Sequence, residues 1–211
     1  FKGKITDRPN EWDSRWWSPI ISAEHLAMRQ RAAMFDLSAF SIFDIVGACA
    51  LDCLQFLAVN QMDVAVGRAV YTPILNKHAG MKSDLTIVRM GEGKFRVITG
   101  VADGPRDKKW FTQHLPEDGS VQLIDQTTEI CTIGVWGPRA RDIMQSLSDT
   151  DMSHEAFKFG WAKEINLGEI TVWAFRISYV GDLGWEIYFP TEYGQKVWDI
   201  IAEVGKPHGI V

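Results

Sequence analysis

The sequence predicts an α+β fold made of two related β-β-α-β-β-α units that pack together. Three observations lead to this prediction. Segments with the two-residue period of strands alternate with amphipathic helical segments along the chain. The chain partly matches itself when it is shifted by 90 residues. No low-complexity linker separates the two halves, which we place at about residues 36–120 and 126–211. Because a unit of this size cannot easily bury both faces of its sheet alone, we expect the halves to share a core.

The first strand and helix of each unit carry the clearest internal match. Residues 41–57 read SIFDIVGACALDCLQFL, and residues 131–147 read CTIGVWGPRARDIMQSL. Both segments pass from a strand pattern through a glycine into an amphipathic helix, and Pro138 suits a first helical turn. We therefore expect helices over 48–58 and 138–148. The identical pairs are Gly47 and Gly137, Ala50 and Ala140, Asp52 and Asp142, Gln55 and Gln145, and Leu57 and Leu147.

The later elements of the two units follow the same shift. Strand-like residues 85–89 align with 175–179, residues 95–98 with 185–188, and the helical stretch 106–115 with 196–205. A hairpin over 84–99 is thus expected to correspond to one over 174–189. Chance similarity between two ordinary α+β segments is the alternative. One constant offset with one element order favours an internal duplication instead.

Composition excludes several classes of function. The net charge is −5 and no long basic run is present, so a nucleic-acid partner is not expected. There is no apolar run of membrane-spanning length, and the acidic balance is typical of a cytoplasmic protein. The three cysteines follow no disulfide spacing, and the five histidines are scattered, so no metal site is expected. No Gly-x-Gly-x-x-Gly segment indicates a flavin or nicotinamide site.

A carboxylate in the second hairpin is the first candidate for ligand binding. Glu186 lies between Trp185 and Ile187 on a segment with strand alternation, after a turn that contains Gly181 and Gly184. A carboxylate in such a place can accept two N–H donors from one planar ligand group. The alternative is a surface glutamate in an ordinary hairpin.

A second carboxylate occupies the corresponding region of the first unit. Asp84 follows the loop that contains Asn76 and Gly80, and it precedes the apolar segment 85–90. Its ordinary role would be a strand-start cap or a solvated turn carboxylate. Asn76 fits turn chemistry and is kept as an organiser of the loop.

Four motifs in order resemble those of the T-protein (aminomethyltransferase) family. Residues 178–186, SYVGDLGWE, resemble its Gly-Tyr-Thr-Gly-Glu-x-Gly-x-Glu signature, in the form found in folate domains fused to flavin-dependent dimethylglycine and sarcosine dehydrogenases or oxidases. Residues 75–85, LNKHAGMKSDL, are similar to Leu-Asn-x-x-Gly-Gly-x-x-Asp-Asp-Leu, with Ala79 for the first Gly and Ser83 for the first Asp. Residues 34–40 and 136–140 match the Phe-Asp-x-Ser and Gly-Pro-x-Ala elements.

The resemblance implies a cofactor and roles for particular residues. The family binds tetrahydrofolate, and its members are built from two related halves. Asp84 stands at the position of the family's catalytic carboxylate, Glu186 at the position that recognises the pterin, and Tyr179 at the cleft. Thr99 falls where T-proteins commonly carry Asn, and we expect it, with Asn76, among the cofactor-binding residues.

The resemblance also implies how the chain is divided. We expect an N-terminal extension over 1–30 and a folate-binding, aminomethyltransferase-like domain over 31–211. The family's later Arg and its C-terminal barrel domain would lie past Val211 and are absent here, as is the flavin domain of the fused enzymes. The chain therefore reads as a piece of a longer protein.

Three functions remain open on the sequence. The first is a tetrahydrofolate-binding domain that passes a methylene group from an oxidised N-methyl amine to tetrahydrofolate, with a flavoprotein domain or subunit as partner and a small amine as donor. The second is a stand-alone glycine-cleavage T-protein or a folate-dependent demethylase. The third is a non-catalytic folate-binding or interaction module. The variants around Leu183 and Ser83 favour the first.

Overall fold

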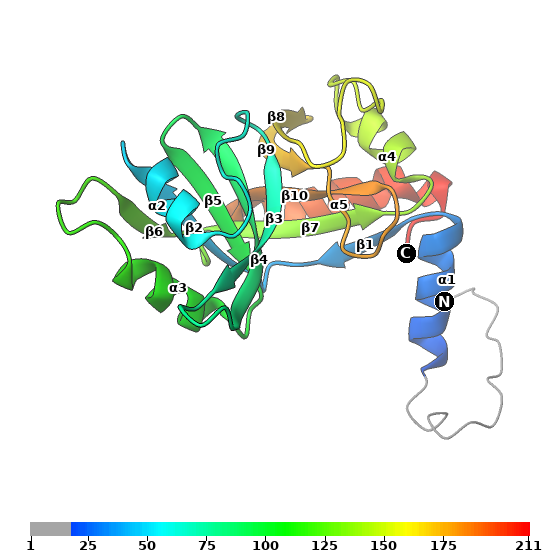
Figure 1. The fold of residues 1–211 in the computed structure, drawn as a ribbon. Helices are drawn as coiled ribbons and strands as arrows, with labels where there is room; N and C mark the ends of the chain where they lie inside the picture. The colour runs from blue at the N-terminus through cyan, green and yellow to red at the C-terminus, as the bar shows by residue number, and fades with distance from the viewer. Residues whose placement is uncertain (1–17) are drawn as a thin grey trace.

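Two five-stranded antiparallel sheets form the centre of this mixed α/β structure (Figure 1). The computed structural model describes residues 18–211. Most of the expected 1–30 extension, residues 1–17, thus lies outside the described residues. The rest of it forms helix α1 (Pro19–Gln30), whose N-terminus Ser18 caps through its side chain. Met28 packs with Trp136 in a small apolar cluster, so the C-terminal part of α1 belongs to the folded unit.

The first sheet has the strand order β3-β4-β5-β2-β6 and is covered on one face by α2 and α3. Its elements are β2 (Ser41–Val46), α2 (Ala50–Leu57), β3 (Ala69–Leu75), β4 (Met81–Gly91), β5 (Lys94–Thr99), α3 (Gly104–Gln113) and β6 (Gln122–Asp125). Alternate strand residues such as Leu85 and Val97 pack with Leu54 of α2 and Phe111 of α3. This alternation assigns every second residue to the helical face and the others to the opposite face.

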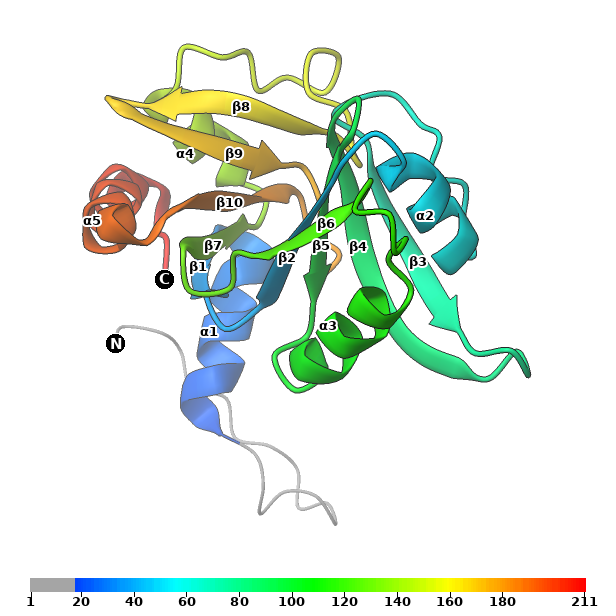
Figure 2. The same ribbon diagram turned by 90° about the vertical axis from the view of Figure 1, so that its left-hand side faces the viewer.

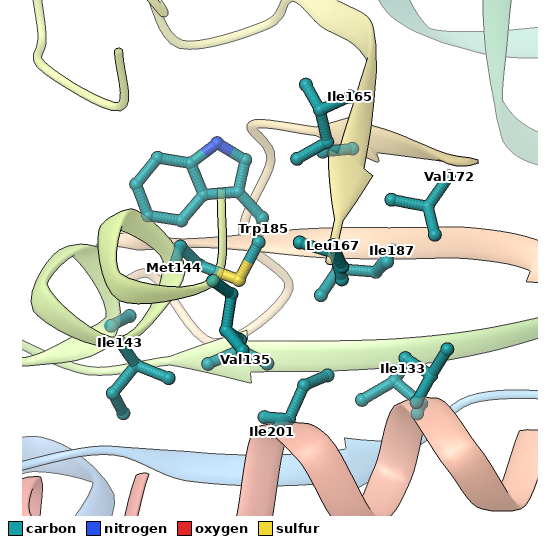
Figure 3. Packing of buried hydrophobic residues seen from close by; sticks show 14 of the residues in the cluster. Ile133, Val135, Ile143, Met144, Ile165, Leu167, Val172, Trp185, Ile187 and Ile201 are labelled. Atoms are coloured by element: carbon teal, nitrogen blue, oxygen red, sulfur yellow. The ribbon is translucent and has the colours of Figure 1, made fainter. Parts of the chain in front are cut away.

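The second sheet has the order β1-β7-β10-β9-β8, with α4 and α5 against its outer face. Its elements are β1 (Ala33–Asp36), β7 (Ile130–Trp136), α4 (Ala140–Leu147), β8 (Ala162–Leu167), β9 (Ile170–Phe175), β10 (Gly184–Pro190) and α5 (Gly194–Gly205). Two short 3-10 helices, η2 (Thr191–Tyr193) and η3 (Lys206–His208), flank α5. Figure 3 shows Met144 and Ile201 of these helices packed toward Val135, Trp185 and Ile187 of the sheet.

The free faces of the two sheets meet in the middle of the molecule. One cluster of buried residues joins Ile42, Val88 and Ile98 of the first sheet to Phe175 and Tyr188 of the second. Figure 2 shows α2 and α3 on one outer side of this pair of sheets and α4 and α5 on the other. The edge strands also touch, because Arg68 and Trp161 form an isolated bridge between the segments that lead into β3 and β8. The space between the sheets is therefore the seam at which a shared site can form.

The observed order of elements departs from the expected β-β-α-β-β-α. Three strands, not two, lie between the helices of each half. The extra strands, β3 and β8, are edge strands of their sheets. Their patterns are weak, since Pro73 interrupts β3 and β8 carries Lys163 and Glu164. An edge strand tolerates proline and charge because one side makes no ladder hydrogen bonds.

The two short outer strands pair with the half to which they do not lead. β1 runs into β2 along the chain, yet it pairs with β7, and β6 runs into β7, yet it pairs with β2. Both pairings are antiparallel. This exchange ties the two sheets together, so neither half is closed without the other.

The strand-to-helix turns of the two halves share their geometry. Gly47 and Gly137 both have positive φ, 142° and 128°. A Cβ at Gly47 would lie 2.0 Å from the Ser120 carbonyl oxygen, and one at Gly137 would lie 2.5 Å from that of Arg31. Each glycine is therefore required both by its backbone conformation and by a close approach of neighbouring backbone.

The C-terminal end of the described region is hydrogen-bonded to the segment that follows α1. The Met34 amide donates to the Val211 carbonyl oxygen at 2.8 Å, and the Val211 amide donates to that of Ala32 at 3.1 Å. The last residues thus run alongside the start of β1. Across residues 18–211, none of the helices combines the length and apolarity needed to cross a bilayer.

Candidate functional site

Both candidate carboxylates lie on the strand faces that turn toward the seam. On β4, Leu85 and Ile87 pack under the helices, whereas Val88 belongs to the cluster between the sheets. Asp84 shares the face of Val88 because side chains alternate along a strand. On β10, Glu186 shares the face of Tyr188, which lies in the same inter-sheet cluster. The two acids therefore project from different sheets toward one seam.

Asp84 is an exposed residue within β4, not a residue before the strand, because the strand already begins at Met81. Its carboxylate accepts a hydrogen bond from the hydroxyl of Tyr71 on the neighbouring strand β3. This hydrogen bond is the main cause that raises the pKa of the Tyr71 hydroxyl, and Tyr179 adds a smaller electrostatic contribution. The structure thus joins Asp84 directly to Tyr71, and both tyrosines are open to solvent, with Tyr71 63% and Tyr179 85% exposed.

Glu186 is buried, with 5% of its surface exposed. Burial raises the pKa of its carboxyl group, and a hydrogen bond from Tyr188 acts in the opposite direction. The Tyr188 hydroxyl donates to Oε2 of Glu186 at 2.5 Å. Within residues 18–211, Tyr188 is the only hydrogen-bond donor to this carboxylate, so Oε1 is left for a further donor.

Strand β7, on one side of β10, presents no side chain opposite Glu186. Glu186 lies opposite Gly134 of β7, and a Cβ at Gly134 would come within 2.4 Å of the Trp136 ring. The Trp136 indole lies across this position and donates from Nε1 to the Ile177 carbonyl oxygen at 2.9 Å. An aromatic wall, not a cation, therefore borders the carboxylate on this side.

Asn76 shapes the turn between β3 and β4. Its Oδ1 accepts from the amides of His78 at 2.9 Å and Gly80 at 3.0 Å. Ala79 within this turn has a φ of 60°, a left-handed conformation that favours glycine. Asn76 thus holds the loop that leads into the Asp84 strand, and among residues 18–211 its side chain bonds to the loop and not to Asp84.

Thr99 lies on the other face of its sheet, away from the seam. It shares the face of Phe95 and Val97, which pack under the helices. Its hydroxyl donates to Oδ2 of Asp107 in α3 at 2.6 Å, as does the Ser83 hydroxyl. This buried network fixes α3 to β4 and β5, and the structure does not bring Thr99 together with Asp84, Tyr179 or Glu186.

A shallow pocket of about 290 Å³ adjoins the loop between β9 and β10. It is lined by Phe159, Arg176, Ile177, Ser178, Gly181, Asp182, Leu183 and Gly184. Neither Asp84 nor Glu186 lines it. Arg176 is held by the Phe157 carbonyl oxygen at 2.5 Å, which fastens the preceding loop to the sheet. Among residues 18–211 no cluster of three potential metal ligands occurs.

Comparison with known proteins identifies the family. The GCVT N-terminal domain matches residues 3–211. The chain belongs to this family. It is an aminomethyltransferase-like domain related to the glycine cleavage T-protein and to dimethylglycine dehydrogenase.

Relatives of this GCVT N-terminal domain include larger enzymes. It is 32% identical over 96% of its length to a 4-methylaminobutanoate oxidase (formaldehyde-forming) of Paenarthrobacter nicotinovorans, and 33% identical over 96% to human mitochondrial dimethylglycine dehydrogenase. It is 30% identical over its whole length to an aminomethyltransferase of Thermoanaerobacter. The domain spans 24%, 23% and 56% of these three proteins, respectively.

Solved structures share the fold. Aminomethyltransferase T of the Bartonella henselae glycine cleavage system superposes with a TM-score of 0.75 at 21% identity, over 89% of this chain and 49% of that one. A chain of the heterotetrameric sarcosine oxidase of Corynebacterium gives 0.70 at 14% identity, over 90% and 93%. At these identities the likeness concerns the fold alone.

Two tyrosines beside the candidate acids were not predicted from the sequence. Tyr188 stands two residues after Glu186, and the period of the strand already places both side chains on one face. Strand alternation could therefore have identified Tyr188 from the sequence. Tyr71 lies 13 residues before Asp84, and no local pattern indicates that β3 and β4 pair in the register that joins Tyr71 to this carboxylate.

Proposed function

We propose that this chain is a tetrahydrofolate-binding, one-carbon transfer domain that receives a methylene group from an amine-derived donor. The observation that carries the proposal is the buried Glu186 carboxylate, which has one oxygen bonded to Tyr188 and the other without a donor in the described chain. Oε1 does not belong to the fully buried side-chain atoms that lack a partner, so it is open to a molecule from outside the chain. A ligand with N–H donors could bond to this oxygen, and the low exposure of the residue would strengthen that bond, which supports a binding site here.

The donor pattern of the ligand follows from the carboxylate. A reduced pterin ring offers a ring N–H beside an exocyclic amino group, and this pair matches the two acceptor oxygens of a carboxylate. Tetrahydrofolate supplies the amine nitrogens that take up the one-carbon unit. Glu186 would hold the pterin, the exposed ring of Tyr179 would lie along it, and Asn76 would organise the loop before β4.

Asp84 is the group that we assign to the chemistry. Its carboxylate is exposed at the seam and already accepts a hydrogen bond from the Tyr71 hydroxyl. A carboxylate in this position can hold a proton on a bound amine nitrogen and favour positive charge as it develops there. Thr99 is not included, because its hydroxyl is engaged with Asp107 on the helical face.

The donor and the partner follow from the family. The names of two relatives, 4-methylaminobutanoate oxidase and dimethylglycine dehydrogenase, identify oxidised N-methyl amines as their chemistry. We infer that such an amine supplies the carbon and that a flavoprotein domain or subunit oxidises it, in the cytoplasm. A stand-alone aminomethyltransferase is the nearest alternative, supported by the Thermoanaerobacter relative.

A non-catalytic module is a further candidate. A mouse mitochondrial pyruvate dehydrogenase phosphatase regulatory subunit is 30% identical over 92% of this chain. Its name describes regulation, so the fold by itself does not require catalysis. Retention of Asp84 with a proton-donating partner favours the transfer function.

We also infer that the two halves descend from one duplicated unit. Two side-chain contacts recur after 90 residues. Gln55 of α2 accepts from the amide of Met62 at 2.9 Å, and Gln145 of α4 accepts from the amide of Met152 at 2.9 Å. The turn glycines and both sheet orders follow the same correspondence. In an experimental structure, failure of residues 41–113 to superpose on 131–203 would contradict this inference.

Calorimetric titration with 5-formyltetrahydrofolate tests the binding function. Glu186→Gln should bind less tightly by about 1.5–3 kcal/mol, the usual worth of a hydrogen bond to a charged group. Glu169→Gln, in the exposed turn between β8 and β9, is the matched control and should bind as the unaltered protein does. Equal affinity of Glu186→Gln and the control would remove Glu186 from the site.

A further inference from the structure

Glu186 and Arg96 occupy corresponding places on β10 and β5, but their surroundings differ. Arg96 lies opposite Asp44 on β2, and its Nε and Nη2 donate to the two oxygens of that carboxylate at 2.8 and 3.0 Å. Glu186 lies opposite Gly134 on β7. The first sheet thus neutralises its buried charge across strands, whereas in the second sheet Glu186 faces only Gly134 and the apolar Phe175 of β9 and has no charged cross-strand partner.

Tyr188, on the same strand as Glu186, provides the hydrogen bond that the neighbouring strands do not. Its hydroxyl donates to Oε2 of Glu186 at 2.5 Å. The ring is 1% exposed and packs on Phe175 with the ring centroids 4.4 Å apart. Because packing fixes the ring, the hydroxyl oxygen is held in one place, and the carboxylate that accepts its hydrogen bond is held in one orientation.

The charges that face this pair come from one side. Arg96 of the facing sheet lies close enough to lower the pKa of the Tyr188 hydroxyl, although burial and the charge of Glu186 raise it by more. Asp44 anchors Arg96, and Lys94 approaches Asp44 at 3.4 Å. The strands that flank β10 bring only uncharged residues opposite the pair, namely Gly134 and Thr132 of β7 and Phe175 and Trp173 of β9.

We propose that Tyr188 is a positioning residue that holds the Glu186 carboxylate in one orientation, so that its free oxygen can accept N–H donors from the ring of a reduced folate. This inference rests on the proposed function and adds a residue to it. Without the hydroxyl, the carboxylate keeps its burial but loses its only donor in the described chain. Two consequences follow: the carboxylate can turn, and it takes up a proton more readily.

Titration of Tyr188→Phe with 5-formyltetrahydrofolate from about pH 5.5 to about pH 8.5 tests both consequences. The variant should bind about tenfold less tightly near neutral pH, as expected for a lost hydrogen bond to a charged group. Its affinity should also fall at a higher pH than that of the unaltered protein, because the Tyr188 bond opposes the rise that burial causes in the pKa of Glu186. Tyr193→Phe, outside β10, is the matched control.

The outcomes separate the two proposals. If Glu186→Gln weakens binding while Tyr188→Phe matches Tyr193→Phe at every pH, the positioning role is wrong and the binding function stands. If Glu186→Gln also has no effect, the proposed function itself fails. A uniform loss of affinity in Tyr188→Phe without a shift of the pH profile would indicate a merely structural role and overturn the proposal.

A measurement on the unaltered protein covers the case in which Tyr188→Phe does not fold. Nuclear magnetic resonance should find the Tyr188 hydroxyl proton protected from exchange with water, and still protected in the complex with 5-formyltetrahydrofolate. A hydroxyl proton that exchanges freely, or that becomes unprotected when the ligand binds, would contradict the proposal.

Discussion

The ion pair of Asp44 and Arg96 lies in the seam between the sheets, and its removal is expected to destabilise the fold asymmetrically. Asp44 is 4% and Arg96 7% exposed, and two hydrogen bonds of 2.8 and 3.0 Å join them. We consider three variants: Asp44→Leu, Arg96→Met, and the two changes together. Each replacement is apolar and similar in length, so the charge is the main change.

The loss of stability in each variant depends on which buried charge is left without a partner. Asp44→Leu leaves a buried guanidinium with no carboxylate partner in residues 18–211, which should cost about 3–5 kcal/mol of unfolding free energy. Arg96→Met leaves Asp44 with Lys94 at 3.4 Å, and the Lys94 side chain is half-exposed. It can move closer, so this variant should cost less than Asp44→Leu, roughly 2–3 kcal/mol. The double variant removes both charges and should lie within about 1–2 kcal/mol of the unaltered protein.

Urea denaturation of the three variants at neutral pH measures these differences and gives the coupling energy of the pair. The expected coupling is large, because the two single costs should far exceed the cost of the double change. Single variants that each lose less than about 1 kcal/mol, or a double variant as unstable as the sum of both, would refute the reasoning that an unpaired buried charge dominates.

Three further predictions concern the turn, the buried acid and the exposed acid. Ala79→Gly should stabilise the protein by up to about 1 kcal/mol in thermal unfolding, because the φ of 60° strains alanine; a loss of stability would contradict the left-handed turn. Glu186→Gln should stabilise the ligand-free protein by roughly 1–3 kcal/mol near neutral pH. Burial raises the folded-state pKa of Glu186, so this advantage should shrink as the pH falls through that pKa and vanish below the ordinary value; an advantage independent of pH would refute it. In the full-length gene product, supplied with dimethylglycine as the probe amine, Asp84→Asn should leave amine oxidation intact but lower the yield of 5,10-methylenetetrahydrofolate and release formaldehyde. Unchanged folate product would remove Asp84 from the transfer step.

The sequence predicted the elements with strong local patterns. The helix expected over 48–58 is α2 (Ala50–Leu57), and the helix expected over 138–148 is α4 (Ala140–Leu147). Glycine punctuation and helical periodicity are local signals and therefore readable. The pairing of β1 with β7 and of β6 with β2 could not be predicted, because it depends on contacts between segments that lie far apart in the sequence, such as Ala33 with Trp136 and Phe43 with Asp125.

In the candidate site, too, features set by local strand alternation could be predicted, and features set by long-range pairing could not. The faces of Glu186 and Tyr188 follow from strand alternation, and so does that of Thr99, since Phe95 and Val97 share its face and are apolar. The placement of Thr99 under α3 could thus have been inferred from its neighbours. The Tyr71 bond to Asp84 and the approach of Arg96 to Tyr188 arise from sheet register and sheet packing, which no single segment encodes.

A structure of the protein with 5-formyltetrahydrofolate would test most directly whether a reduced folate binds between the two sheets. We expect the pterin ring in the seam, with its ring N–H and amino group within hydrogen-bond distance of Glu186 and its reduced ring near Asp84 and Tyr179. The Tyr188 hydroxyl should remain bonded to Oε2 of Glu186. A pterin bound elsewhere, such as in the pocket beside Arg176, with Glu186 left without a ligand, would contradict it.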